Sequence, residues 1–95
     1  MRLTKKEIDL IKRAFQESFK DGKIYLFGSR VDDSQKGGDI DLYIVSTITN
    51  NLREAKGRFL FKLYEYIGEQ KIDIVIAKDK NRLIEQEALK FGIEL

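Results

Sequence analysis

Two β-strand patterns, at residues 40–45 and 72–77, constrain the fold of this chain more than any other feature of its sequence. Side chains alternate across a strand, so the branched apolar residues of each segment share one face. The opposite faces carry acidic residues. Asp39 lies just before the first segment, Asp41 lies within it, and Asp73 lies within the second. If the apolar faces pack against helices, every strand aspartate points to the other side of the sheet.

The remaining segments alternate between helical and extended patterns. Thr4 and Glu7 are spaced as a capping box, which begins a helix. A later helix can begin at Asn50 or Asn51 and a third at Asp79, because these side chains are typical helix caps. The expected elements are helix 4–19, strand 23–27, strand 40–45, helix 51–67, strand 72–77, helix 79–91 and a short edge strand over the last three residues. This order, α-β-β-α-β-α, predicts an α+β fold in which a small mixed sheet has helices packed on one face.

Length and composition limit the possible functions. With 95 residues the chain is expected to form a single domain, 1–95. Its 18 basic and 16 acidic side chains leave a net charge of +2, which argues against broad nucleic-acid binding. The absence of cysteine and histidine excludes thiolate catalysis, a histidine base and zinc bound by these residues. No apolar run approaches a membrane span and the N-terminus lacks a signal-peptide pattern, so a cytoplasmic location is expected.

The three strand aspartates are spaced as a candidate metal site. Asp39 and Asp41 are two residues apart, about 7 Å along a strand, and Asp73 can join them if the two strands are neighbours about 4.8 Å apart. Three such carboxylates repel one another, and a divalent cation relieves that repulsion. Oxygen-only ligation favours Mg²⁺ or Mn²⁺. The alternative is that each aspartate is a solvated strand-end residue, but two strands that place aspartate on the same face favour the metal site.

The turn after the first strand is a candidate phosphate site. Gly28 lets an anion approach the main chain, Ser29 offers a hydroxyl, and Arg30 offers a cationic group. An ordinary Gly-Ser turn is the alternative. The loop lacks the Gly-Lys-Ser/Thr of a P-loop, and the acidic stretch 32–41 lacks EF-hand spacing.

Together these features resemble a known enzyme superfamily. The strings "LFGSR", "DID" and "KIDIVI" resemble the nucleotidyltransferase superfamily related to polymerase β. The short length and the string "GGDIDLYIV" are similar to its minimal nucleotidyltransferase (MNT) branch, whose members are usually encoded beside a helical HEPN-domain partner. Two departures from the family pattern are the acidic residues Asp32 and Asp33 after "GSRV", and Gly38 where a serine often precedes the first metal aspartate.

The resemblance implies a reaction and roles for the candidate residues. It implies that two divalent ions and an NTP, in this branch ATP, meet at the site, and that a nucleoside monophosphate is transferred to a hydroxyl with release of pyrophosphate. The implied ligands of the metal are Asp39, Asp41 and Asp73, with Asp73 also near the attacking hydroxyl. The implied phosphate contacts are Gly28, Ser29 and, less directly, Arg30.

The resemblance also implies a partner. The acceptor would be a tyrosine of a HEPN-type toxin, or another helical substrate-binding subunit encoded nearby, and the chain would act as an antitoxin. The apolar surface of residues 58–67 covers more than half of a helical wheel, which favours a homo- or hetero-oligomeric contact unless this helix is sunk in the core. The alternatives are a non-catalytic antitoxin subunit that only binds its partner, a small-molecule nucleotidyltransferase, and an RNA-end nucleotidyltransferase.

Overall fold

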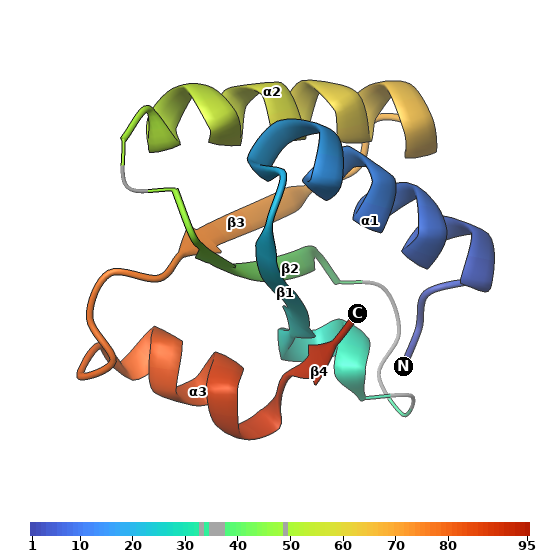
Figure 1. Cartoon of the computed structure of the whole chain (residues 1–95). Helices are drawn as coiled ribbons and strands as arrows, with labels where there is room; N and C mark the ends of the chain where they lie inside the picture. Colours follow the sequence, from blue (N-terminus) through green and yellow to red (C-terminus); the bar gives the residue numbers. More distant parts are fainter. Residues whose placement is uncertain (33, 35–37, 49) are drawn as a thin grey trace.

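The computed structural model describes residues 1–32, 34, 38–48 and 50–95 (Figure 1). The elements in chain order are α1 (Lys5–Phe19), β1 (Gly22–Phe27), the 3₁₀ helix η1 (Gly28–Val31), β2 (Ile40–Ser46), α2 (Leu52–Ile67), β3 (Ile72–Ile76), α3 (Leu83–Phe91) and β4 (Ile93–Glu94). Figure 1 shows α1 and α2 on one side of the sheet and α3 on the other. Within the described ranges, no helix has both the length and the apolar character needed to cross a bilayer.

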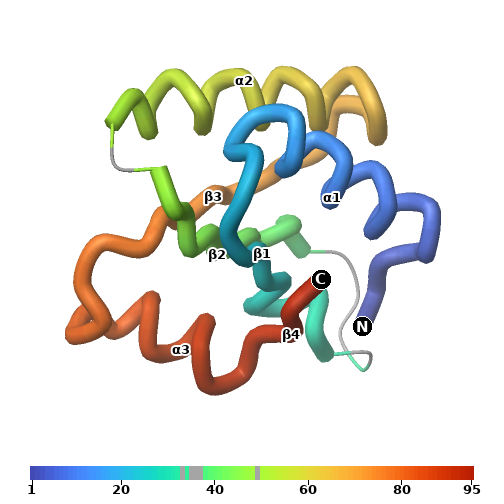
Figure 2. Tube along the Cα trace, in the orientation of Figure 1, coloured from blue at the N-terminus to red at the C-terminus, as the bar shows by residue number. Residues whose placement is uncertain are grey.

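The four strands form one mixed sheet in the order β3-β2-β1-β4. β1 pairs antiparallel with β2 and with β4, and β2 pairs parallel with β3. Figure 2 shows how the C-terminal strand β4 returns to lie beside β1. The predicted α+β class with a small mixed sheet is confirmed, as are the neighbouring positions of β2 and β3 and the short edge strand.

The apolar face of the sheet carries the main core. The alternate residues of β2, which are Ile40, Leu42 and Ile44, are fully buried there beneath α1 and α2. Phe59 of α2 packs edge-on against Phe15 and Phe19 of α1, with ring centroids 6.3 and 6.0 Å apart. Because this face takes the branched residues, the aspartates of β2 and β3 are left on the other face, as the alternation predicts.

The position of α3 corrects the prediction that the helices share one face. A second apolar cluster forms on the aspartate side of the sheet, where Ala88 of α3 packs with Phe27 and Tyr43. The large aromatic side chains of β1 and β2 on this face need cover, and α3 supplies it over the middle of the sheet. The face of the sheet that carries the aspartates is therefore partly covered by α3.

The beginnings of two helices also differ from the prediction. The Asp79 side chain accepts a hydrogen bond from the amide of Asn81 at 2.9 Å, and the Asp79 carbonyl accepts one from Arg82 at 3.0 Å. These bonds close a turn, so α3 begins at residue 83 rather than at Asp79. Asn51 precedes α2 in the left-handed region, with φ of 55°, and its side chain makes no capping hydrogen bond.

Candidate active site

Two of the predicted aspartates lie directly opposite each other on neighbouring strands. The parallel register of β2 and β3 pairs Asp41 with Asp73. The pKa of Asp41 is raised from its ordinary value of 3.8 to about 6, first by burial and then by the charges of Asp73 and Asp39 and a side-chain hydrogen bond with Asp73. A raised carboxyl pKa next to like charges indicates a crowded acidic site of the kind that a cation relieves.

The third aspartate lies on the same face but has a different neighbour. The Asp39 carboxylate is 3.6 Å from the ammonium group of Lys71, which stands at the start of β3. No group of three or more acidic side chains in the described ranges is arranged to hold a metal ion as it stands. The three carboxylates nevertheless suit Mg²⁺ or Mn²⁺, because they offer only oxygen ligands and because Asp41 and Asp73 already lie close together. To complete a three-carboxylate metal site, Asp39 would have to leave its ion pair with Lys71 and bind the ion.

The Gly-Ser turn stands directly over this pair. Gly28 begins η1 with φ of +75°, and a Cβ at this position would lie 2.3 Å from the Oδ2 of Asp41. Only glycine combines this left-handed conformation with so close an approach to a carboxylate. The structure therefore brings Gly28, Asp41 and Asp73 together, as the metal-and-phosphate interpretation requires.

Gly38 lies close to the Ser29 side chain, a proximity that the sequence did not reveal. Gly38 has φ of +89°, and a Cβ there would lie 2.2 Å from the Ser29 hydroxyl oxygen. The left-handed φ at Gly38 disfavours a serine there, and a serine side chain would also require the Ser29 hydroxyl to move. Ser29 is half-buried, and Asp32 is exposed. Asp33 lies outside the described residues.

Arg30 is placed as a clamp on the main chain. Its guanidinium donates to the carbonyls of Gly38 at 3.3 Å and Arg2 at 3.0 Å. Arg2 in turn donates to the carbonyls of Ser29 at 3.0 Å and Asp32 at 3.2 Å. These two arginines fasten the N-terminal segment to η1. Arg2 was missed by sequence reasoning because nothing in its local pattern signals a contact so distant in the chain.

A cleft opens above the acidic pair. It has a volume of about 720 Å³, within the range typical of small-molecule sites. Gly28, Asp41 and Asp73 line it, together with Lys56 of α2 and Glu87 of α3. Ser29 lines an adjoining hollow of about 350 Å³ that shares Gly28 and Glu87 with the cleft. A separate cavity of about 560 Å³ lies at the other end of this face, lined by tyrosines and lysines and by none of the three aspartates.

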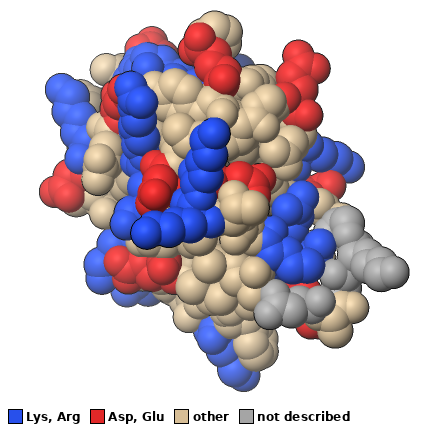
Figure 3. All heavy atoms as spheres, turned by 90° about the vertical axis from the view of Figure 1, so that its right-hand side faces the viewer, with Lys and Arg blue, Asp and Glu red and all other residues tan. Residues whose placement is uncertain are grey.

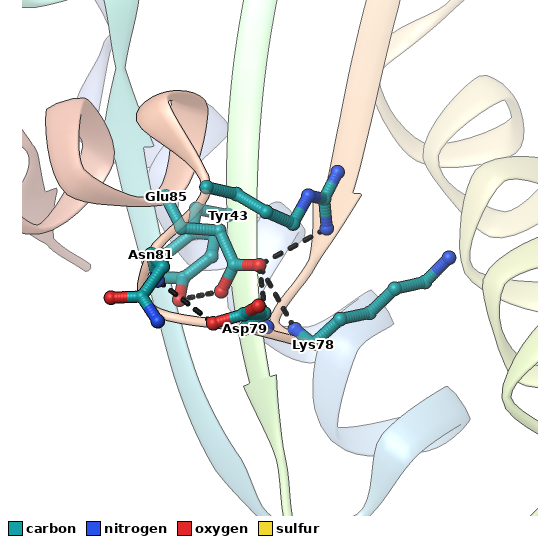
Figure 4. Close-up of polar contacts among 6 residues, drawn as sticks. Tyr43, Lys78, Asp79, Asn81 and Glu85 are labelled. Atoms are coloured by element: carbon teal, nitrogen blue, oxygen red, sulfur yellow. Dashed lines mark hydrogen bonds and ion pairs between the residues drawn. The ribbon is translucent and has the colours of Figure 1, made fainter.

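A buried carboxylate anchors α3 beside the site (Figure 4). Glu85 is 0% exposed and accepts hydrogen bonds from the Tyr43 hydroxyl at 2.8 Å and from the amides of Lys78 and Asp79 at 3.0 and 2.9 Å. Arg82 adds a charged contact at 3.0 Å. Burial alone would raise the pKa of Glu85, but these donors outweigh it and lower the pKa. Tyr43 follows Asp41 by two residues on β2, so this network fixes α3 against the strand that carries the acids.

Comparison with known proteins identifies the family. The family model described as "Polymerase beta, Nucleotidyltransferase" matches residues 6–95. This chain belongs to the polymerase β nucleotidyltransferase family. Among solved structures, the fold resembles a chain of a mutant toxin–antitoxin complex, MntA–HpeT, with a TM-score of 0.69 and 20% identity, over 93% of this chain and 70% of that one. No curated protein matches the sequence significantly.

Membership of the polymerase β nucleotidyltransferase family agrees with the sequence prediction and with the observed sheet. The likeness to the MntA–HpeT chain supports the fold at low identity. The geometric features that accompany this membership are the opposed pair Asp41 and Asp73 and the close approach of Gly28.

Proposed function

We propose that this chain is a metal-dependent nucleotidyltransferase that transfers AMP from ATP to a tyrosine hydroxyl of a HEPN-type partner and thereby acts as an antitoxin. The observation that carries the enzymatic part is the opposed pair Asp41 and Asp73 beneath the Gly28 turn, in a family of nucleotidyltransferases. Carboxylates brought together in one cleft repel each other unless a cation binds, so their placement there favours a metal-dependent function.

The proposed roles follow from the placement of the residues. Asp41 and Asp73, joined by Asp39 when it leaves Lys71, hold the divalent ions. When bound, such ions neutralise phosphate charge and stabilise the attacking and leaving oxygens of an in-line displacement. The amides of the Gly28 turn and the Ser29 hydroxyl bind the β- and γ-phosphates. Arg30 supports this turn from behind, so its contribution to phosphate binding is indirect.

The reaction proposed for the site balances as a simple displacement. The acceptor hydroxyl oxygen forms a bond to the α-phosphorus of ATP, and the bond from that phosphorus to the β-phosphate bridging oxygen breaks. Pyrophosphate leaves along the Gly28 and Ser29 side of the cleft. Asp73 is assigned to orient the hydroxyl and accept its proton, because it lies on β3, on the far side of Asp41 from β1 and the Gly28 turn.

A partner contact is supported by apolar surface on α2. Phe59 and Leu63 are fully buried, which explains much of the wide apolar arc of this helix. Phe61 and Tyr64, however, are 64% and 38% exposed and lie one turn apart on its outer side. Exposed aromatic side chains of this kind are enriched at interfaces. The fold's likeness to a chain from a toxin–antitoxin complex supports a toxin as the partner.

Co-expression with a HEPN-type partner tests the proposal. Intact-mass analysis of the partner after incubation with ATP and Mg²⁺ is expected to show the added mass of AMP with the wild-type chain and none with Asp41→Asn. Asp9→Asn, an exposed change on α1, is the matched control and should retain transfer. An unmodified partner with the wild-type chain, under conditions in which the two proteins bind, would contradict the enzymatic proposal.

The non-catalytic alternative makes the opposite prediction. It is favoured by one observation, the engagement of Asp39 with Lys71 in place of a ready three-acid metal site. A growth-rescue assay separates the two functions. If Asp41→Asn and Asp73→Asn still neutralise the toxin, binding suffices, whereas loss of rescue by both variants with retained binding supports catalysis.

A further inference from the structure

In the described part of the chain, β3 has an open edge whose main-chain groups can face a ligand. β3 is an edge strand, hydrogen-bonded to β2 on one side only. The amide of Ile40 donates to the carbonyl of Lys71 at 3.0 Å, and the amide of Ala77 donates to Ile44 at 2.8 Å. The odd-numbered residues of this segment therefore turn their main chain toward β2. Since direction alternates along a strand, the residues that turn N–H and C=O groups to the open edge are Ile72, Ile74 and Ile76.

A basic groove runs along this edge between α2 and the segment that follows β3. It has a volume of about 420 Å³ and an apolar floor that includes Ile74 and Ile76. Its charged lining residues are Arg53, Lys56, Lys78 and Arg82, and none of the described residues that line it is acidic. Arg82 also bonds to Glu85. No ion pair within the described ranges engages Arg53, Lys56 or Lys78.

The charged residues that line this groove in the described part of the chain are all basic. Figure 3 shows another face, on which basic and acidic side chains are interspersed, as the near-balance of 18 and 16 predicts. In Figure 4 the Lys78 side chain extends away from the Glu85 carboxylate, so its ammonium group does not take part in the hydrogen bonds around Glu85. A groove lined by one sign of charge attracts a ligand of the opposite sign.

The groove opens into the candidate active site. Lys56, Ile74 and Val75 line both the groove and the cleft that holds the acidic pair. Asp73 immediately precedes Ile74 on the same strand. A ligand extended along the edge of β3 would consequently pass beside Asp73, the residue assigned to the acceptor hydroxyl.

We propose that this groove binds the acceptor as an extended acidic polypeptide segment, added to the sheet as a strand beside β3; the inference rests on the proposed nucleotidyl transfer to a protein hydroxyl. The open N–H and C=O groups match a peptide backbone. The basic walls match acidic side chains. Sites for single-stranded nucleic acid combine positive charge with aromatic stacking surfaces, and the described residues that line this groove include no aromatic side chain.

The geometry also predicts the spacing between the modified residue and the acidic residues of the acceptor segment. Asp73 and Ile76 are three residues apart, about 10 Å along a strand. Lys78 and Arg82 follow the Ile76 end of the strand and line the groove, whereas the acidic pair lies at the Asp73 end. The modified hydroxyl residue should therefore lie about three positions from the acidic residues of the segment, which a peptide series can resolve.

Binding of fluorescent peptides to the full chain tests the proposal without any chemistry. The probe is a tyrosine peptide with glutamates three to five positions away, compared with the same peptide bearing lysines, an alternately N-methylated copy and a single-stranded oligonucleotide. The test variant is Arg53→Glu/Lys78→Glu, and the control is Lys5→Glu/Lys6→Glu on α1. Arg53 lies in the first turn of α2, where an acidic residue favours the helix, so the fold should tolerate the change.

The acidic peptide should bind the wild-type chain best and lose roughly tenfold in affinity with the test variant. N-methylation should weaken binding comparably, and the α1 control should bind as the wild type does. Asp41→Asn should abolish AMP transfer yet keep peptide binding, which separates failure of the groove from failure of the reaction. Equal affinity for acidic and basic peptides, insensitivity to N-methylation, or tighter binding of the oligonucleotide would overturn the proposal.

Discussion

The crowded carboxyl pair should make the metal-free protein less stable than a variant that lacks one charge. Asp41 has a pKa of about 6 in the folded chain against an ordinary 3.8, a difference that corresponds to at most about 3 kcal/mol. Because the group is partly open to solvent, about 1–2 kcal/mol is the realistic cost. With the folded pKa raised, the unfolded chain releases the proton first, so stability falls as pH rises from about 4 to about 6 and stays reduced above that range.

Thermal unfolding of Asp41→Asn in a chelator measures this cost. The variant should match the wild type near pH 4 and exceed it at pH 7.5, with a Tm gain of about 4–8 °C per kcal/mol. Asp9→Asn, which is exposed on α1, should show no such pH-dependent gain. Mg²⁺ should raise the Tm of the wild type and not that of Asp41→Asn. A variant no more stable than the wild type at pH 7.5, or an advantage equal at both pH values, would refute the crowding argument.

Three further substitutions have defined outcomes. Gly28→Ala should abolish nucleotide transfer, because a Cβ would lie 2.3 Å from the Asp41 carboxylate and φ is +75°; full activity in a transfer assay would contradict this. Tyr43→Phe removes a donor from buried Glu85 and should lower the free energy of unfolding by about 1–3 kcal/mol in urea titration; a loss below about 0.5 kcal/mol would argue against the network. Gly57→Ala should stabilise α2 by about 0.5–1 kcal/mol, since no atom lies within 4 Å of the new Cβ; a lower Tm would show an unrecognised constraint.

Local patterns predicted the strands and the face on which the acids lie. The alternation in β2 placed Asp41 opposite the core, and the parallel register then brought Asp73 beside it. This prediction succeeded because the buried face of a strand strongly specifies which side chains point outward. The capping box of Thr4 and Glu7 is likewise present, because it depends on contacts three residues apart.

Long-range contacts could not be predicted in the same way. The side of the sheet covered by α3 depends on Glu85 reaching Tyr43 across 42 positions of the chain. The clamp between Arg2 and η1 spans 27 positions and has no local pattern. The contact of Asp39 with Lys71 depends on the offset between two strands, which the sequence does not specify.

The central claim is that one cleft holds both the metal ions and the triphosphate. A crystal structure of the chain with Mg²⁺ and a non-hydrolysable ATP analogue tests it most directly. The metal should be bound by Asp41 and Asp73, with Asp39 turned away from Lys71, and the β- and γ-phosphates should lie on the turn at Gly28. A nucleotide bound elsewhere, for example in the tyrosine-lined cavity at the far end of the sheet, would contradict the account.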